Sequence, residues 1–404
     1  MSEPLVIIGK GMAATRLIDE LSKRALGRYA IAVIGDEPRR AYNRVLLSPF
    51  LAGEIEEGDM ELKPASWWAA RGVTTLYGQA AVEIDAQAKR VMLANGASIP
   101  YSKLALATGS QPIRLPIPGA DFPNVVTFRD FNDVAAMLAS AGRGKRAVVI
   151  GGGLLGLEAA YGLARHGAAV TVVHLMDRLM ERQLDPEAAE LLASGLRAKG
   201  IEVALNAQTQ AIEGDARARR VLLKDGRSFD ADLVVLAAGI RPNVALARAA
   251  GVAINRGIVV DDRLTSSDPD IFALGECAEH RGAVYGLVEP AYEQARTLAG
   301  ALAGEDVRYE GSVTATNLKV TGVNVFSAGE FLESEGAEII TLRDRGARLY
   351  KKLVIRDDRL IGVVLVGHTS DGLWYLDLIR EAASIDAIRD ALIFGRSVAD
   401  RLAA

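Results

Sequence analysis

The sequence contains very little cysteine and histidine. Among its 404 residues there are one cysteine, Cys277, and four histidines. A single thiol excludes a redox-active cysteine pair within the chain, and so few scattered ligands predict no iron–sulfur, zinc or other metal site. Peroxidase or coenzyme A reductase chemistry through a single sulfenic acid stays open. Our interpretation of Cys277 is a small buried residue.

Two further shortages narrow the class of protein. No apolar run approaches the roughly 20 residues that a membrane-spanning helix needs, and no basic and then apolar leader precedes the first apolar run. We therefore expect a cytoplasmic protein without a membrane partner. Positive charge is not in excess either: the net charge is −4, which argues against nucleic acid as a partner. Half of the residues are hydrophobic, and the length suits two or three domains.

Glycine, in contrast, occurs in two clusters of one pattern, each after an apolar run typical of a buried strand. The clusters are Gly9-Lys10-Gly11-Met12-Ala13-Ala14, after residues 5–8, and Gly151-Gly152-Gly153-Leu154-Leu155-Gly156, after residues 147–150. In this pattern the first glycine permits a tight turn, the second lets a pyrophosphate approach the backbone, and the third small residue lets helix and strand pack closely. The phosphates then meet a helix N-terminus, which favours negative charge. Two dinucleotides are therefore expected, in two domains.

Two other small-residue turns accompany the clusters. A strand at 104–106 leads to Thr108-Gly109, and residues 270–274 lead to Gly275-Glu276. The order of the four segments resembles the two-dinucleotide flavoproteins, in which the first cluster binds FAD and the second binds NAD(P)H in an inserted domain. The resemblance implies that Thr108 and Gly109 lie by FAD at the hinge into that domain, and that Gly275 and Glu276 hold the FAD ribityl and pyrophosphate. Any one of these glycines alone would be equally compatible with an ordinary turn.

The segment after the second strand adds expected FAD contacts. A carboxylate in Asp36-Glu37, by our interpretation Glu37, would accept hydrogen bonds from the adenosine ribose. A Tyr-x-Arg-x-x-Leu-Ser motif that contains Arg44 and Ser48 resembles the ferredoxin and rubredoxin reductases, where the arginine lies along the FAD. Many of these relatives have a lysine by the flavin ring directly after the serine, where this chain has Pro49. The remaining expected FAD contacts are Ala81, Pro290 and Lys319.

Four further residues are expected to serve NAD(P)H. Glu158 stands where relatives have a glutamate near the nicotinamide, so we assign it the catalytic role; the alternative is a solvated helix carboxylate. His174 stands where a carboxylate would select NADH and an arginine would accept NADPH, and Arg178 follows it. Neither rule is met, and resemblance alone favours NADH. Gly239, in the turn that returns the chain from the NAD domain, would touch the coenzyme.

Longer stretches resemble one branch more closely: the flavoprotein module of assimilatory nitrite reductase large subunits and the stand-alone flavoprotein partners of assimilatory nitrate reductase. The matching stretches are residues 172–185, 274–282 and 318–329. The full nitrite reductases continue into an iron–sulfur module and a sirohaem domain, which these 404 residues do not include. We therefore expect an electron-input protein that passes electrons from NADH or NADPH through FAD to a nitrate or nitrite reductase subunit or a small iron–sulfur carrier.

The predicted fold class is α/β: two Rossmann-like dinucleotide-binding domains, the NAD domain inserted in the FAD domain, plus a C-terminal α+β interface domain where a homodimer would pair. In that last domain we expect strands followed by helices, and the second helix is expected at 385–393. The expected boundaries are 1–110 and 238–304 for the FAD domain, 111–237 for the NAD(P)H domain and 305–404 for the C-terminal domain.

Two other functions stay open at this point. One is a ferredoxin or rubredoxin reductase that serves an oxygenase or an oxygen-detoxifying system. The other is a redox-sensing flavoprotein that binds both nucleotides without useful turnover.

Overall fold

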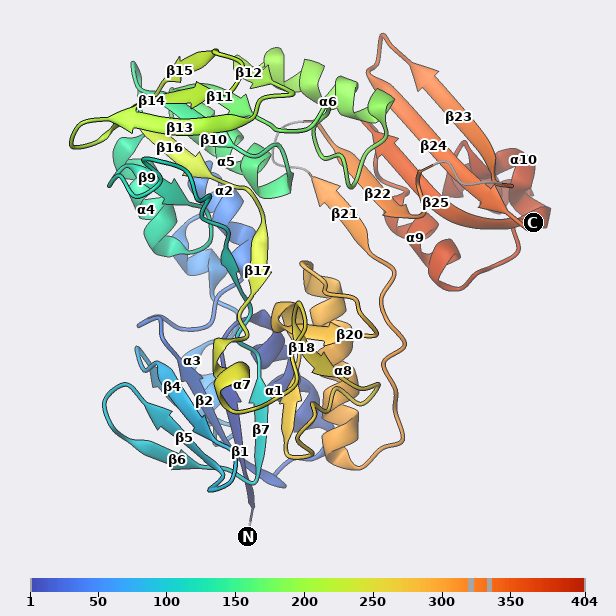
Figure 1. The fold of residues 1–404 in the computed structure, drawn as a ribbon. Helices are drawn as coiled ribbons and strands as arrows, with labels where there is room; N and C mark the ends of the chain where they lie inside the picture. Colours follow the sequence, from blue (N-terminus) through green and yellow to red (C-terminus); the bar gives the residue numbers. More distant parts are fainter. Residues whose placement is uncertain (1, 319–322, 333–335, 403–404) are drawn as a thin grey trace. The chain divides into compact units, whose positions relative to one another are not determined.

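The computed structural model describes residues 2–318, 323–332 and 336–402, and Figure 1 shows its ribbon. The chain divides into two compact units. The first contains the residues up to Leu47, Glu56–Gln111 and Ile240–Ser312, and the second contains Ser48–Ile55, Pro112–Gly239 and the residues from Val313 onward. The division into three domains with the boundaries given above stays a prediction.

The first unit is built on a five-stranded parallel sheet in the order β19-β7-β1-β2-β3. In its central strand, Leu5 to Ile8 are at most 5% exposed. Continuous apolar runs of this kind are typical of parallel strands, which are covered on both faces. The strands are β1 (Glu3–Ile8), β2 (Tyr29–Gly35), β3 (Thr74–Tyr77), β7 (Lys103–Leu106) and β19 (Ile271–Ala273).

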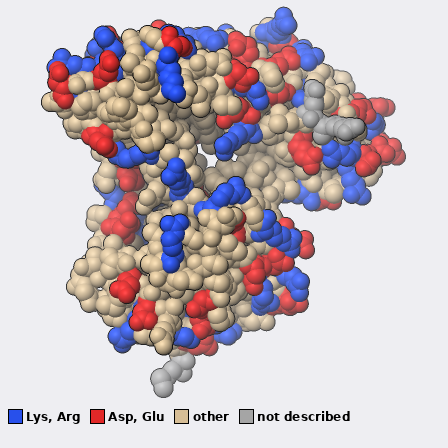
Figure 2. Space-filling model, viewed as in Figure 1, with Lys and Arg blue, Asp and Glu red and all other residues tan. Residues whose placement is uncertain are grey.

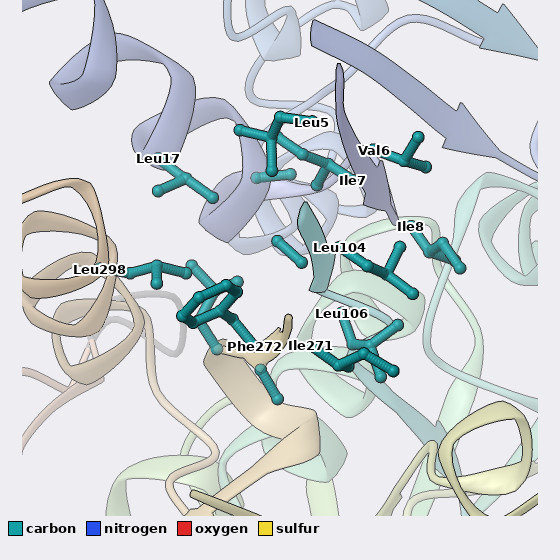
Figure 3. Packing of buried hydrophobic residues seen from close by; sticks show 14 of the residues in the cluster. Leu5, Val6, Ile7, Ile8, Leu17, Leu104, Leu106, Ile271, Phe272 and Leu298 are labelled. Atoms are coloured by element: carbon teal, nitrogen blue, oxygen red, sulfur yellow. The ribbon is translucent and has the colours of Figure 1, made fainter. Parts of the chain in front are cut away.

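Two helices of the first unit, α1 (Met12–Arg24) and α8 (Val288–Ala303), pack on each other. Figure 3 shows Leu17 and Leu298 from these helices in the same cluster as the strand residues Leu5 and Leu104. The smaller elements of this unit are η1 (Arg44–Leu46), η2 (Glu57–Met60), α3 (Ala65–Ala69), α7 (Ala245–Ala249), η3 (Gly275–Cys277), the antiparallel strands β4 (Ala81–Asp85), β5 (Arg90–Leu93) and β6 (Ser98–Pro100), and the parallel pair β18 (Ile258–Val260) and β20 (Ala278–His280). The short strands β8 (Ser110–Pro112) and β17 (Ile240–Pro242) pair with each other.

The second unit repeats the plan with a parallel sheet in the order β12-β11-β10-β16-β9. In both sheets the strand before a glycine cluster, β1 or β10, lies between two partners, and a helix follows it directly. The elements are α2 (Leu47–Leu51), β9 (Val125–Thr127), α4 (Phe131–Ser140), β10 (Arg146–Ile150), α5 (Leu154–Arg165), β11 (Ala169–Val173), α6 (Pro186–Arg197), β12 (Ile201–Ala204), β16 (Leu233–Leu236) and the antiparallel strands β13 (Thr209–Gly214), β14 (Ala218–Leu223) and β15 (Ser228–Asp230).

The C-terminal part of the second unit is an antiparallel sheet in the order β21-β22-β25-β24-β23 with helices packed on it. α6 of the parallel part contacts β25 of this sheet. The elements are β21 (Ala315–Leu318), β22 (Val325–Gly329), β23 (Glu338–Asp344), β24 (Leu349–Arg356), β25 (Arg359–Val366), α9 (Gly372–Arg380), η4 (Asp386–Ile388), α10 (Arg389–Leu392) and α11 (Arg396–Leu402). The predicted fold class, two Rossmann-like sheets plus a C-terminal α+β part, is confirmed.

One expected element differs. The helix predicted at 385–393 is a 3-10 turn followed by the four-residue α10. The Ile385 N–H donates to the Asp358 carbonyl at 2.9 Å, and Ser384 bridges to Arg359, so residues 384 and 385 lie against the β24–β25 turn. The helix is interrupted at Ile388, whose φ of −121° and ψ of 4° are not helical, and α10 begins only after this residue.

The described residues include no helix that is both long and apolar enough to cross a membrane. Figure 2 shows Lys and Arg interspersed with Asp and Glu on the face in view, in keeping with the small net charge of −4.

Candidate functional site

The first glycine cluster forms the turn between β1 and α1. Gly9 has a φ of +106°, and a Cβ built there would lie 2.1 Å from the Ala107 carbonyl oxygen, so only glycine fits. Gly11 is the N-cap of α1, and Met12, Ala13 and Ala14 begin the helix. Ala14 is fully buried, which lets α1 lie close to its strand.

The second cluster has the same geometry. Gly151 has a φ of +128°, and its added Cβ would lie 2.2 Å from the Ala237 carbonyl oxygen. Gly153 is the N-cap of α5, which starts with Leu154 and Leu155. A Cβ on Gly156 would lie 2.0 Å from the Gly151 carbonyl oxygen, so this third glycine sets the close packing of the helix on the turn.

Both turns fit a dinucleotide pyrophosphate. A Cβ added at Gly11 or Gly153 would meet no protein atom within 4 Å, so the backbone there faces open space. Within the described residues neither N-cap receives a side-chain hydrogen bond, and the first turns of α1 and α5 contain no acidic residue. The N–H groups and the dipole of each helix are thus left for an anion.

Expected FAD residues gather at the end of β2. The Glu37 carboxylate accepts hydrogen bonds from Arg44 Nη2 at 2.5 Å and from the Tyr42 hydroxyl at 2.9 Å. Asp36 is exposed and accepts the Glu37 N–H. Lys10, which we did not predict, donates from Nζ to the Glu37 carbonyl at 2.5 Å. The first cluster and the acidic segment are thereby tied together.

A second group of expected FAD residues meets between β7 and α8. The hydroxyl of Ser110 donates to Glu276 Oε2 at 2.8 Å, and that of Thr108 donates to the Asn243 carbonyl at 2.8 Å. The Asn243 N–H in turn donates to the Gly109 carbonyl. Gly275 has a φ of +79° and lies beside Ala13. The sequence predicted each of these turns as a site, but it did not predict the hydrogen bond between Ser110 and Glu276.

Gln294 is another residue that the sequence reasoning missed. It is 1% exposed on α8, and its Oε1 accepts the Gly275 N–H at 2.7 Å. A glutamine within an amphipathic helix gives no signal of this kind until the fold is known.

Glu158 is buried, with 7% of its surface exposed. Its Oε2 accepts a hydrogen bond from the Ser48 hydroxyl at 2.5 Å. Burial raises the pKa of Glu158 to about 7, although the Ser48 hydrogen bond opposes the rise. The solvated-carboxylate alternative is therefore wrong, and the side chain can hold or release a proton near neutral pH. Ser48, expected at the FAD, is thus hydrogen-bonded to the residue expected at the nicotinamide; its contact with FAD stays a prediction.

His174 follows β11 and is 8% exposed. Its Nδ1 accepts the Gly152 N–H at 3.0 Å, and its Nε2 lies 3.1 Å from Glu181 Oε2. Arg178 donates to Asp177 at 3.1 Å and to the Leu184 carbonyl. Gly239, with a φ of +106°, precedes β17, and its carbonyl accepts the Ile113 N–H.

Two expected FAD residues, Ala81 and Pro290, are not joined to these groups by a described hydrogen bond. Ala81 is half-buried at the start of β4, and Pro290 is buried in the first turn of α8. Lys319 lies outside the described residues. Cys277 is fully buried, its Sγ lies 3.3 Å from both the Leu106 and the Leu274 carbonyl oxygens, and burial raises the pKa of the thiol. A buried neutral thiol is a poor nucleophile, as the packing interpretation requires.

Comparison with known proteins places this geometry in a family. Residues 3–296 match the model of the pyridine nucleotide-disulphide oxidoreductases, and residues 315–383 match the rubredoxin NAD+ reductase C-terminal domain. The chain is 46% identical over 382 residues to nitrite reductase [NAD(P)H] of Bacillus subtilis (strain 168), covering 94% of this chain and 48% of that protein.

Two further similarities agree with this match. The chain is 42% identical over 390 residues to the assimilatory nitrate reductase electron transfer subunit of Bacillus subtilis (strain 168), covering 96% of this chain and 51% of that protein. It thus spans about half the length of both curated relatives.

A chain in the crystal structure of the covalent putidaredoxin reductase–putidaredoxin complex superposes with a TM-score of 0.88 at 27% identity, covering 99% of this chain and 98% of that one. The chain belongs to the pyridine nucleotide-disulphide oxidoreductase family.

Proposed function

We propose that this protein takes electrons from NAD(P)H and passes them through FAD to a separate redox protein, a component of an assimilatory nitrate or nitrite reductase. When bound, the flavin accepts a hydride from the coenzyme and releases electrons one at a time. The two most informative relatives are named for nitrite reduction and for electron transfer to nitrate reductase. We propose the cytoplasm as its location.

The observation that carries this proposal is the presence of two open dinucleotide cradles on a chain with one cysteine. Gly11 and Gly153 each leave room for a pyrophosphate. Cys277 is buried among backbone carbonyls, so it offers no thiol pair to receive electrons. An acceptor on another protein accounts for both facts.

We assign the described residues to two tasks. The Gly9–Ala14 turn, Glu37, Arg44, Thr108, Gly275 and Glu276 would hold FAD in the first unit. The Gly151–Gly156 turn, His174 and Gly239 would hold the coenzyme in the second. Glu158, with its pKa of about 7, would hold a proton near the reacting ring, and Ser48 would orient its carboxyl group through their 2.5 Å hydrogen bond.

The test is anaerobic stopped-flow reduction of the purified holoprotein by NADH and by NADPH, followed by mixing with candidate acceptors. We expect one coenzyme to bleach the flavin within seconds and a nitrate or nitrite reductase component to reoxidise it faster than ferredoxin or rubredoxin does. The reverse order of acceptors would replace this proposal by the second candidate. Slow bleaching, with no acceptor taking electrons, would support a sensor and refute both.

The second candidate is a ferredoxin or rubredoxin reductase. Its support is the match of residues 315–383 to the rubredoxin NAD+ reductase C-terminal domain. A solved neighbour that is crystallised with putidaredoxin has the same fold over nearly its whole length. We rank it second because the two relatives described above, at 46% and 42% identity, are named a nitrite reductase and an assimilatory nitrate reductase electron transfer subunit.

A further inference from the structure

The end of β11 carries a feature that bears on the choice of coenzyme. β10 and β11 are parallel and paired up to Ile150 opposite Val173. The residue after β11, His174, therefore lies beside the Gly151–Gly156 turn. In dinucleotide-binding folds a carboxylate near this strand end accepts the ribose 2′-hydroxyl of NADH, whereas an arginine accepts the 2′-phosphate of NADPH.

The hydrogen bonds of His174 fix its tautomer. Because the Gly152 N–H can only donate, Nδ1 accepts, and in the neutral ring Nε2 carries the proton. Nε2 therefore donates to Glu181 Oε2, 3.1 Å away. The backbone of His174 is also held: its N–H donates to the Ala204 carbonyl at 2.8 Å, and its carbonyl accepts the Ala207 N–H at 2.9 Å.

The loop that brings Glu181 to this place is built into the core. Leu179, Met180 and Leu184 are at most 1% exposed, and the Met180 N–H donates to the Gly152 carbonyl at 3.0 Å. The Glu181 side chain itself is 24% exposed. Its carboxylate is thus anchored at the strand end while part of it still faces solvent.

The charges of the loop balance. Arg178 is paired with Asp177 at 3.1 Å, and Arg182, with an 86% exposed side chain, has Nε 4.0 Å from Glu181 Oε1. Two arginines are thus offset by two carboxylates, and Glu181, which is bonded to His174, is the less exposed carboxylate, at 24% against 63% for Asp177. At Glu181 itself a 2′-phosphate would face a carboxylate, whereas a 2′-hydroxyl would find a hydrogen-bond acceptor. Leu175 and Met176, which directly follow His174, expose 58% and 43% of their surface. They offer an apolar surface on which an adenine ring would pack.

We infer that Glu181, positioned by His174, accepts the 2′-hydroxyl of the coenzyme ribose and makes NADH the coenzyme of this protein. Glu181 supplies, seven residues further along the chain, the carboxylate that is missing directly after β11. His174 acts through Glu181 and is a positioning residue. The inference rests on the proposed function, because it concerns the same coenzyme site.

The test is calorimetric titration of the FAD-loaded protein with NAD+ and with NADP+. For the wild type we expect NAD+ to bind at least about tenfold more tightly, the effect of one charge-assisted hydrogen bond. Glu181→Gln should lower this ratio about tenfold or more. Glu190→Gln is the matched control, because Glu190 lies on α6 of the same unit and pairs with Arg197; it should leave the ratio unchanged.

His174→Asn should lower the ratio as well, and the double variant should be no worse than Glu181→Gln alone, since both changes remove one interaction. A purely structural role of His174 would give additive losses. One measurement needs no variant: the wild type should bind ADP at least about tenfold more tightly than 2′-deoxy-ADP.

Equal or tighter binding of NADP+, or equal binding of ADP and 2′-deoxy-ADP, would overturn the inference and leave the proposed function intact. Binding of neither NAD+ nor NADP+ would instead refute the proposed function.

Discussion

At the scale of single residues, Glu158 gives a prediction about pH and stability. Its carboxyl group keeps its proton up to about pH 7 in the folded chain but only to its ordinary pKa of 4.5 in the unfolded chain. Between these values the unfolded chain binds fewer protons, so the free energy of unfolding falls as pH rises. Glu158→Gln has no carboxyl group to titrate at this position, so its free energy of unfolding does not fall in this way. Relative to wild type, the variant should gain on the order of 2 to 3 kcal/mol between about pH 5 and pH 8 in urea unfolding.

Ser48→Ala and Glu213→Gln are the controls for this prediction. The Ser48 hydroxyl lowers the pKa of Glu158, so its removal should move the loss of stability to higher pH. Glu213 is exposed, and its change to glutamine should not alter the pH profile. A constant difference between Glu158→Gln and wild type at both pH values would contradict the burial argument.

The same residues show what a sequence reveals at this scale. Glu158 was found because it stands where relatives have a glutamate, and His174 because it follows the second strand of the NAD(P)H domain. Their partners were not, because Ser48 is 110 positions from Glu158, and Glu181 is selected by which ring nitrogen of His174 carries the proton. Spacing locates a residue on a strand or helix, whereas a hydrogen-bond partner depends on tertiary packing.

At the scale of elements, alanine substitutions at two glycines of the second cluster should have different effects, one on the stability of the fold and the other on dinucleotide binding. A Cβ on Gly156 would lie 2.0 Å from the Gly151 carbonyl oxygen and 3.3 Å from Ala237 Cβ. Gly156→Ala should therefore lower the free energy of unfolding by about 1 to 3 kcal/mol, despite the better helix propensity of alanine. Thermal or urea unfolding, followed by a signal from the second unit, measures this loss in the free energy of unfolding.

Gly153→Ala is the matched change. Its Cβ would meet no protein atom within 4 Å, so stability should change by less than about 1 kcal/mol, as for other N-cap substitutions. The methyl group would occupy the approach of the pyrophosphate, and we expect NAD+ to bind at least about tenfold more weakly. Normal NAD+ binding by Gly153→Ala would mean that the phosphates lie elsewhere.

Helices and strands could be predicted from the sequence where a single local feature, such as a continuous apolar run, determines them. The apolar runs before both clusters became central parallel strands, because such runs are buried on both faces. The helix expected at 385–393 is interrupted at Ile388, whose φ of −121° and ψ of 4° are not helical, and helical periodicity does not indicate this interruption.

At the scale of the whole molecule, the order of the sheets followed from the order of the glycine clusters, but the grouping of the C-terminal residues did not. Residues from Val313 onward belong to the same compact unit as the β10 sheet. Pairs of side chains join these parts: Tyr350 and Lys352 meet Asp185, and Arg343 meets Glu187. Such pairs lie more than 150 positions apart, so no local pattern indicates them.

Asp185 is the centre of this junction and carries the last prediction. Its carboxylate caps α6 through the Ala188 N–H at 2.9 Å, accepts the Tyr350 hydroxyl at 2.7 Å, and lies 3.5 Å from Lys352 Nζ. The side chains of Asp185 and Lys352 are 7% and 5% exposed. Asp185→Asn keeps a capping oxygen but leaves a buried ammonium without its counter-charge, which costs about 3 to 5 kcal/mol.

Tyr350→Phe should cost about 1 kcal/mol, the value of one hydrogen bond, and Glu187→Gln less than about 1 kcal/mol, because its pair with Arg343 is exposed to solvent. Urea unfolding, monitored by circular dichroism, ranks the three variants by their loss in the free energy of unfolding. Equal losses from Asp185→Asn and Glu187→Gln would show that water reaches Lys352 and that apolar packing holds the C-terminal sheet. The expected order would instead make one capping carboxylate the electrostatic link between the β10 sheet and the C-terminal sheet.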